Sequence, residues 1–169
     1  MGKGFPTGVL TISDKGSQGK REDESGKTAV RLLQGAGFPV VQTKIVPDDT
    51  EQISRTLIEW ADKECLSLVV TSGGTGLSPS DVTPQAMRHV IDFEVPGMAE
   101  AMRAESLKKT PHAMISRAMV GVRKRCLIIN LPGSPGGVND NLSVVLPALK
   151  HALEKLGGDT SDCAAPAAR

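Results

Sequence analysis

The chain has 169 residues, with 20 lysine and arginine residues against 19 aspartate and glutamate residues, which gives a formal net charge of +1. This balance excludes a whole-chain attraction to nucleic acid or to an acidic membrane, and no apolar run is long enough to span a bilayer. The length fits one domain with a sizeable core, and that core must be aliphatic because the chain has three Phe, one Trp and no Tyr.

Cysteine and histidine residues are few and widely spaced. Cys65, Cys126 and Cys163 are odd in number and form no CxxC pair, which favours free thiols over a disulfide framework or a zinc site. The three histidines are also scattered, so we expect no metal site built from His and Cys. The segment MGKGFPTGVL lacks the long apolar region of a secretory signal. We therefore expect a soluble, cytoplasmic protein.

The first half of the chain alternates short β-branched runs with helical patterns. Three strands are predicted, over residues 8–13, 39–46 and 66–71. A charged loop over 14–26 and a helix over 27–33 separate the first two strands. After the second strand, Asp49 is predicted to be the N-cap of a helix, with Gln52 in the capping-box position.

The second half begins with a helix for which Thr83 is the predicted N-cap and Pro84 the first helical residue. The following elements are predicted as a helix over 98–108, strands over 118–122 and 126–131, and a helix over 138–156. Pro147 must either kink the last helix or start its second half.

This order of elements predicts a parallel α/β sheet with right-handed crossovers. The hairpin over 118–131 adds one antiparallel edge to an otherwise parallel sheet. We see no repeats and no domain linker, so residues 1–157 are expected to form one domain, followed by a flexible C-terminal tail over 158–169.

Three loops should leave the carboxyl ends of the predicted strands, where open α/β sheets bind their ligands. They are Ser13-Asp14, Gly73 to Asp81 and Pro132 to Gly137. All three are rich in small, hydrogen-bonding residues. If their strands are parallel neighbours, the loops converge on one cleft.

The run Ser72-Gly-Gly-Thr-Gly76 has two interpretations. Its glycines let backbone N–H groups approach a phosphate closely, or they simply form an ordinary turn. The run does not continue as GxGxxG, because Pro79 stands at the offset of the third glycine. Gly26-Lys27-Thr28 ends like a Walker A motif, but Arg21 occupies the position of the earlier glycine.

Two carboxylates stand beside these loops. Asp81 either caps the next helix or remains free, since Thr83 already fits the cap position. Asp48 lies next to Asp49, which is the better cap candidate. If the glycine loop binds phosphates, a counter-cation is needed, and proteins usually hold Mg²⁺ by one or two carboxylates together with phosphate oxygens.

No nucleophile motif is present. The chain has no G-x-S-x-G elbow, and no Cys or Ser stands in sequence contact with a His. Asn130 and Ser134 flank Leu-Pro-Gly, which is either a simple turn or a pair of side chains that hold a polar ligand.

Six segments combine in a fixed order along the chain. They are Thr11-Ile-Ser-Asp14, Val46-Pro-Asp-Asp49, Ser72-Gly-Gly-Thr-Gly76 with Asp81-Val-Thr-Pro84, Pro96-Gly97-Met98, Ile115-Ser-Arg117 and Ile128-Ile-Asn-Leu-Pro-Gly-Ser134. Together they resemble the MogA/MoaB family of molybdenum-cofactor biosynthesis, which includes the G domain of gephyrin. The likeness runs from about Val9 to Gly157.

The resemblance implies a three-layer α/β/α domain, commonly a homotrimer, with the activity of a molybdopterin adenylyltransferase. Such an enzyme uses Mg²⁺ and ATP to attach AMP to the terminal phosphate of molybdopterin and releases pyrophosphate. By motif match, Asp81 and Asp48 correspond to the catalytic, metal-side acids. The residues that correspond to the ligand-binding loops are Ser13, Asp14, Ser72, Gly73, Gly74, Thr75, Gly76, Asn130, Pro132, Gly133 and Ser134.

Two departures from the family pattern leave the activity open. Ser80 stands where members often carry Arg, and Pro135-Gly136-Gly137 follows Ser134 where many have a basic residue. The alternatives are a non-catalytic molybdopterin carrier, a gephyrin-like scaffold, and a mononucleotide-binding domain with another substrate. The resemblance also implies hand-off of the product to a molybdenum-insertion protein, and neither nucleic acid nor membrane as a partner.

Overall fold

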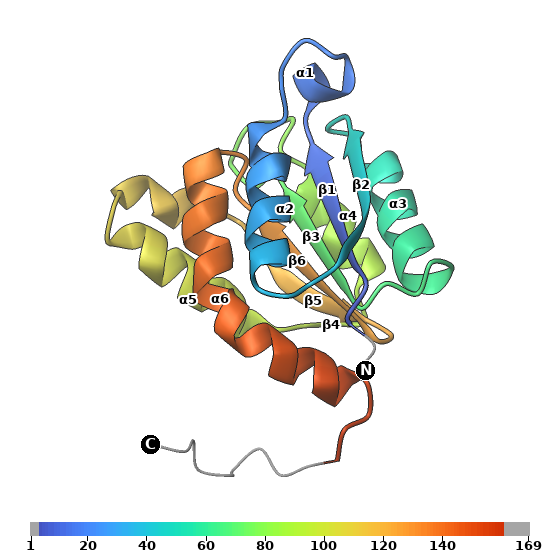
Figure 1. The fold of residues 1–169 in the computed structure, drawn as a ribbon. Coiled ribbons are helices and arrows are strands. Elements are labelled where there is room, and N and C mark those ends of the chain that lie inside the picture. Colours follow the sequence, from blue (N-terminus) through green and yellow to red (C-terminus); the bar gives the residue numbers. More distant parts are fainter. Residues whose placement is uncertain (1–3, 161–169) are drawn as a thin grey trace.

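A six-stranded sheet lies at the centre of residues 4–160, the part of the chain that the computed structural model describes (Figure 1). Its strands are β1 (Thr7–Ile12), β2 (Val40–Val46), β3 (Leu68–Ser72), β4 (Phe93–Glu94), β5 (Val120–Arg123) and β6 (Cys126–Leu131), in the order β2-β1-β3-β6-β5-β4. Strands β2, β1, β3 and β6 are parallel, whereas β5 runs antiparallel to β6 and β4 antiparallel to β5. The predicted mixed sheet is confirmed, and its antiparallel edge has one strand more than predicted.

Helices cover both faces of the sheet (Figure 1). They are α1 (Asp14–Ser17), α2 (Glu24–Gly35), α3 (Thr50–Asp62), α4 (Thr83–Val90), α5 (Pro96–Leu107), the 3₁₀ helix η1 (Pro111–Ile115) and α6 (Pro135–Leu156). Buried side chains of α2, α5 and α6 form one apolar cluster against the sheet, and those of α3 and α4 form a second cluster on the opposite face. The fold is therefore a three-layer α/β/α arrangement with two aliphatic cores.

Side-chain caps mark the start of several helices. The Asp49 side chain caps α3 by accepting a hydrogen bond from the Gln52 N–H at 2.8 Å, as predicted. Helix α2 begins earlier than predicted, because the Asp23 carboxylate accepts a hydrogen bond from the Gly26 N–H at 2.8 Å and caps the helix there. Pro147 lies inside α6, and Figure 1 shows that this helix changes direction along its length.

Some predictions were wrong or incomplete. The loop expected over 14–26 contains the short helix α1, and both β4 and η1 escaped prediction. The predicted N-cap role of Thr83 is also wrong, since α4 has Val82 at the N-cap position and no side-chain cap bond. Most of the predicted tail, with Cys163, lies outside the described residues. In the described range, no helix has both the length and the apolarity needed to cross a membrane.

Candidate active site

Four parallel strands end at the same edge of the sheet, and the loops that leave them line one cavity of about 480 Å³. Strand β1 leads to Ser13, β2 to Asp48, β3 to Gly73 and Gly74, and β6 to Gly133 and Ser134. The structure thus brings the predicted loops together, because parallel strands place their carboxyl ends side by side. This space is called the loop cavity below.

Gly73 and Gly74 pack so closely against the neighbouring residues that neither position has room for a side chain. Gly73 and Gly74 have φ angles of 108° and 64°. A Cβ atom on Gly73 would lie 2.2 Å from the Ile12 carbonyl oxygen, and one on Gly74 would lie 2.2 Å from the Thr83 Oγ1. The Thr83 hydroxyl donates a hydrogen bond to the Gly73 carbonyl oxygen at 2.9 Å. That bond explains why Thr83 does not cap α4.

Two acids bridge the loops that follow β1 and β2. The Asp14 N–H donates to Asp48 Oδ2 at 3.0 Å, and the Asp48 N–H donates to Asp14 Oδ1 at 2.9 Å. Burial raises the pKa of Asp48, and the nearby charges of Asp14 and Asp81 raise it further, although the bond from the Asp14 N–H opposes them. The Asp81 carboxylate accepts a hydrogen bond from the Ser78 N–H at 2.9 Å. The charge of Asp81 thus reaches Asp48 at the cavity wall.

The loop cavity is rich in negative charge. Arg21 is the cation on its lining, and the acids there are Glu22, Asp23, Glu24, Asp48 and Asp81. Within residues 4–160, no group of three or more His, Cys, Asp or Glu side chains is arranged to hold a metal ion. A divalent cation bound here would thus need further oxygen ligands from a substrate, which fits the way proteins hold Mg²⁺ beside phosphates.

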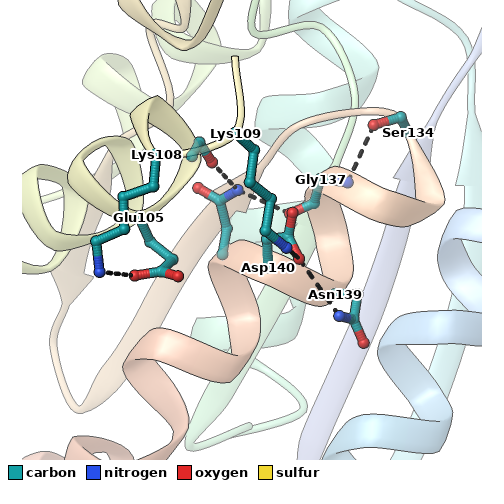
Figure 2. Close-up of polar contacts among 9 residues, drawn as sticks. Glu105, Lys108, Lys109, Ser134, Gly137, Asn139 and Asp140 are labelled. Atoms are coloured by element: carbon teal, nitrogen blue, oxygen red, sulfur yellow. Dashed lines mark hydrogen bonds and ion pairs between the residues drawn. The ribbon is translucent and has the colours of Figure 1, made fainter.

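A second cavity of about 460 Å³ adjoins the loop cavity at Ser134. Thr75, Gly76 and Pro132 line it, together with basic side chains that include Lys109. Figure 2 shows the Lys109 ammonium paired with Asp140 at 2.5 Å. Hydrogen bonding to Lys109 is the main cause that lowers the pKa of Asp140. The second cavity is the more cationic of the two.

The N-terminus of α6 separates the two cavities. The Ser134 hydroxyl caps this helix by accepting a hydrogen bond from the Gly137 N–H at 3.1 Å (Figure 2). The positive end of the helix dipole is therefore directed to the place where the cavities meet, and such an end favours phosphate.

Most predicted site residues line one of these cavities, but two do not. Asp14 contacts Asp48 from outside the cavity lining. Asn130 is fully buried beneath the loops, where its Nδ2 donates to Thr71 Oγ1 at 2.9 Å. The Asn130 Oδ1 and the Ser72 Oγ are buried without hydrogen-bond partners among the described residues. Only Ser72 of these two lines the loop cavity.

Sequence reasoning missed the wall that α2 contributes. The Ser25 hydroxyl donates to the Gly133 carbonyl oxygen at 2.6 Å, and the Thr11 hydroxyl donates to Asp23 Oδ2 at 2.6 Å. These bonds fasten the start of α2 to the ends of β1 and β6. The only signal was the cap sequence at Asp23, which lay inside a segment that we predicted to be a loop.

Comparison with known proteins identifies this architecture. Residues 8–151 match the family described as "Probable molybdopterin binding domain". The chain belongs to this family. The MoaB protein of Thermus thermophilus, described as a molybdopterin biosynthesis enzyme, superposes with a TM-score of 0.87 at 49% identity, covering 92% of this chain and 98% of that chain.

Curated relatives of this chain include proteins that it nearly covers and much longer ones. The molybdopterin adenylyltransferase of Helicobacter pylori strain J99 is 39% identical over 154 residues, which cover 90% of this chain and 88% of the relative. Gephyrin of Dictyostelium discoideum is 40% identical over 156 residues, or 86% of this chain. The chain spans only 22% of that gephyrin and 26% of the Drosophila melanogaster cinnamon protein, so it matches one part of these longer proteins.

Proposed function

We propose that this domain is a molybdopterin adenylyltransferase, which transfers AMP from ATP to the terminal phosphate of molybdopterin and releases pyrophosphate. The observation that carries the proposal is that two cavities meet at Ser134. The Gly73–Gly74 turn, the N-terminus of α6 and the acids Asp48 and Asp81 lie around this junction. The junction gives two phosphate-bearing substrates a common meeting point. The similarity to the Helicobacter pylori molybdopterin adenylyltransferase, 88% of which is covered, supports this proposal.

The reaction needs no nucleophile from the protein. An oxygen of the terminal phosphate of molybdopterin attacks the α-phosphorus of ATP and forms a new P–O bond. The bond from that phosphorus to the bridging oxygen of the β-phosphate breaks, and pyrophosphate leaves with the electron pair. The work of the protein is to hold the two anions in line and to stabilise the charge that develops.

The loop residues match this task. The Gly73–Gly74 turn exposes backbone rather than side chain to the cavity, and the α6 N-terminus beside Ser134 adds a positive dipole. The Asp48 and Asp81 carboxylates would hold Mg²⁺ together with substrate phosphate oxygens. When bound, Mg²⁺ neutralises charge on the phosphates and on the leaving pyrophosphate. Without a cation, the acids of this cavity would repel ATP.

The deciding experiment incubates purified protein with Mg-ATP and molybdopterin and measures adenylylated product and pyrophosphate. Wild-type protein should form both, whereas Asp81→Asn should lose transfer and keep more of its ATP binding. Glu100→Gln is the matched control, because Glu100 is an exposed acid of α5 that lines neither cavity. Binding of molybdopterin without product would refute the transferase and favour a carrier. Full activity of Asp81→Asn would remove this acid from the mechanism.

We further propose that the protein is a cytoplasmic homotrimer that passes its product to a molybdenum-insertion protein. Exposed apolar side chains on both sheet edges, Val41 on β2 and Phe93 on β4, offer surface for self-association. Light scattering coupled to size-exclusion chromatography tests the trimer. A monomer at micromolar concentration would contradict it.

A further inference from the structure

Arg117 connects the two ends of the loop that carries Asp81. Its Nε donates to the Gly76 carbonyl oxygen at 2.8 Å, and its second terminal nitrogen donates to the Asp81 carbonyl oxygen at 2.5 Å. The Arg117 N–H also donates to the Thr75 carbonyl oxygen at 2.8 Å. One side chain, 36 residues further along the chain than Asp81, thus closes the loop over 76–81.

The closure fixes where the Asp81 carboxylate stands. A Cβ atom on Gly76 would lie 2.8 Å from Asp81 Oδ2, so the carboxylate packs closely against the backbone of Gly76. The same oxygen accepts the hydrogen bond from the Ser78 N–H. Without the two hydrogen bonds from Arg117, the carbonyl groups at both ends of the loop would no longer be held together, and the Asp81 carboxylate would lose its fixed position.

Arg117 also brings positive charge to a loop that has none. The segment GLSPSD over 76–81 contains no cationic residue, and the Ser80 hydroxyl only shares a hydrogen bond with Ser78. Arg117 is half-buried, and within residues 4–160 it forms no ion pair. Its charge is therefore not neutralised by a carboxylate side chain and acts on the loop itself.

We propose that Arg117 is a positioning residue for adenylyl transfer, which holds Asp81 in place through the carbonyl groups of Gly76 and Asp81. The inference rests on the proposed function of the cleft. Arg117→Lys keeps the charge but lacks the planar fork that bonds two carbonyl groups at once. The misplaced acid should lower kcat about 10- to 100-fold, the cost of a shift of about 1 Å in a reacting site.

A matched control separates positioning from mere stability. Arg123 is also a half-buried arginine that donates to a carbonyl group, that of Val90, at 2.8 Å. Val90 lines neither cavity, whereas Gly76 and Asp81, the two partners of the Arg117 side chain, each line one. Arg123→Lys should lower the unfolding midpoint and leave kcat and the half-saturating Mg²⁺ concentration unchanged. Arg117→Lys should lower kcat and raise that Mg²⁺ concentration. In a hydrogen-exchange experiment, the backbone amides of residues 76–82 should exchange faster in Arg117→Lys than in wild type, while the amides of the sheet stay protected.

The decisive comparison is Mg-ATP binding in the Asp81→Asn background. If Arg117 acts through Asp81, adding Arg117→Lys to Asp81→Asn should change the Kd by less than about twofold, which is the scatter expected in a double-mutant comparison. A further large loss there, or wild-type kinetics and exchange in Arg117→Lys alone, overturns the inference. An equal loss of kcat in Arg123→Lys also overturns it. Failure of the wild-type protein to transfer AMP instead overturns the proposed function, and the inference with it.

Discussion

Replacement of Gly73 by alanine tests whether the glycine loop is fixed by close packing. The backbone at Gly73 has a φ of 108°, a conformation that costs a residue with a Cβ about 1–3 kcal/mol. The new Cβ would also lie 2.2 Å from the backbone oxygen of Ile12, and overpacking of this kind costs about 1–3 kcal/mol more. We therefore expect Gly73→Ala to lower the free energy of unfolding by about 2–6 kcal/mol.

Urea unfolding followed by circular dichroism measures this loss, with the m-value as a check that two-state behaviour is kept. The melting temperature should fall by at least about 4 °C in a chain of this size. Gly136→Ala is the stability control, because no atom lies within 4 Å of a Cβ placed there and the site is in α6. That variant should be neutral or gain up to about 1 kcal/mol. Close packing at Gly73 is refuted if Gly73→Ala unfolds within about 0.5 kcal/mol of wild type, the range of ordinary surface substitutions.

Three further outcomes follow from charge and burial. Hydrogen bonding to Arg123 lowers the pKa of Asp62, so Asp62→Asn should lower the free energy of unfolding at pH 7. In urea titrations, the difference in unfolding free energy between wild type and variant should shrink as the pH falls through the lowered pKa, because the wild-type carboxylate then becomes protonated. The pKa of Asp48 is instead raised, so Asp48→Asn should increase the melting temperature at pH 7 in the absence of Mg²⁺. This increase should vanish below about pH 4, the ordinary pKa range of Asp, where the wild-type residue is protonated in the folded and the unfolded state. A lower melting temperature of the variant at pH 7 would contradict the prediction. Burial raises the pKa of Cys126 to about 12, so mass spectrometry after iodoacetamide treatment at pH 8 should find exposed Cys65 alkylated and Cys126 unmodified until urea unfolds the protein.

Local signals in the sequence were sufficient for the frame of the fold. The cap at Asp49 and the apolar run of β3 each depend on residues within a few positions, so periodicity and capping rules reach them. Thr83 shows the limit of such rules. It looked like a helix cap because of Pro84, yet its hydroxyl bonds to the carbonyl oxygen of Gly73, ten residues earlier. A cap rule cannot anticipate a partner that only the folded loop brings near.

The candidate site depended even more on distant pairs. The bonds between Asp14 and Asp48 join positions 34 residues apart, and that from Ser25 to Gly133 joins positions 108 residues apart. The sequence could predict that loops meet at the carboxyl ends of parallel strands, but not which side chains lock them. Asn130 was predicted to be a ligand-binding residue because it precedes the Pro-Gly-Ser loop. In the structure, the alternation of side chains along β6 places its side chain inside the protein, where it bonds to Thr71.

The electrostatics of the loop cavity connect its fold with its proposed chemistry. The charged form of Asp48 is disfavoured because burial and the charges of Asp14 and Asp81 act on it together. A phosphate ligand alone would increase this repulsion, whereas a divalent cation shared between the acids and the phosphates would relieve it. If the proposed function holds, these charges would favour binding of a nucleotide and a cation together over binding of either alone. Arg117 fits this account, since it holds one of the two acids in place from outside the cavity through backbone carbonyl groups, and so avoids an ion pair that would compete for the carboxylate.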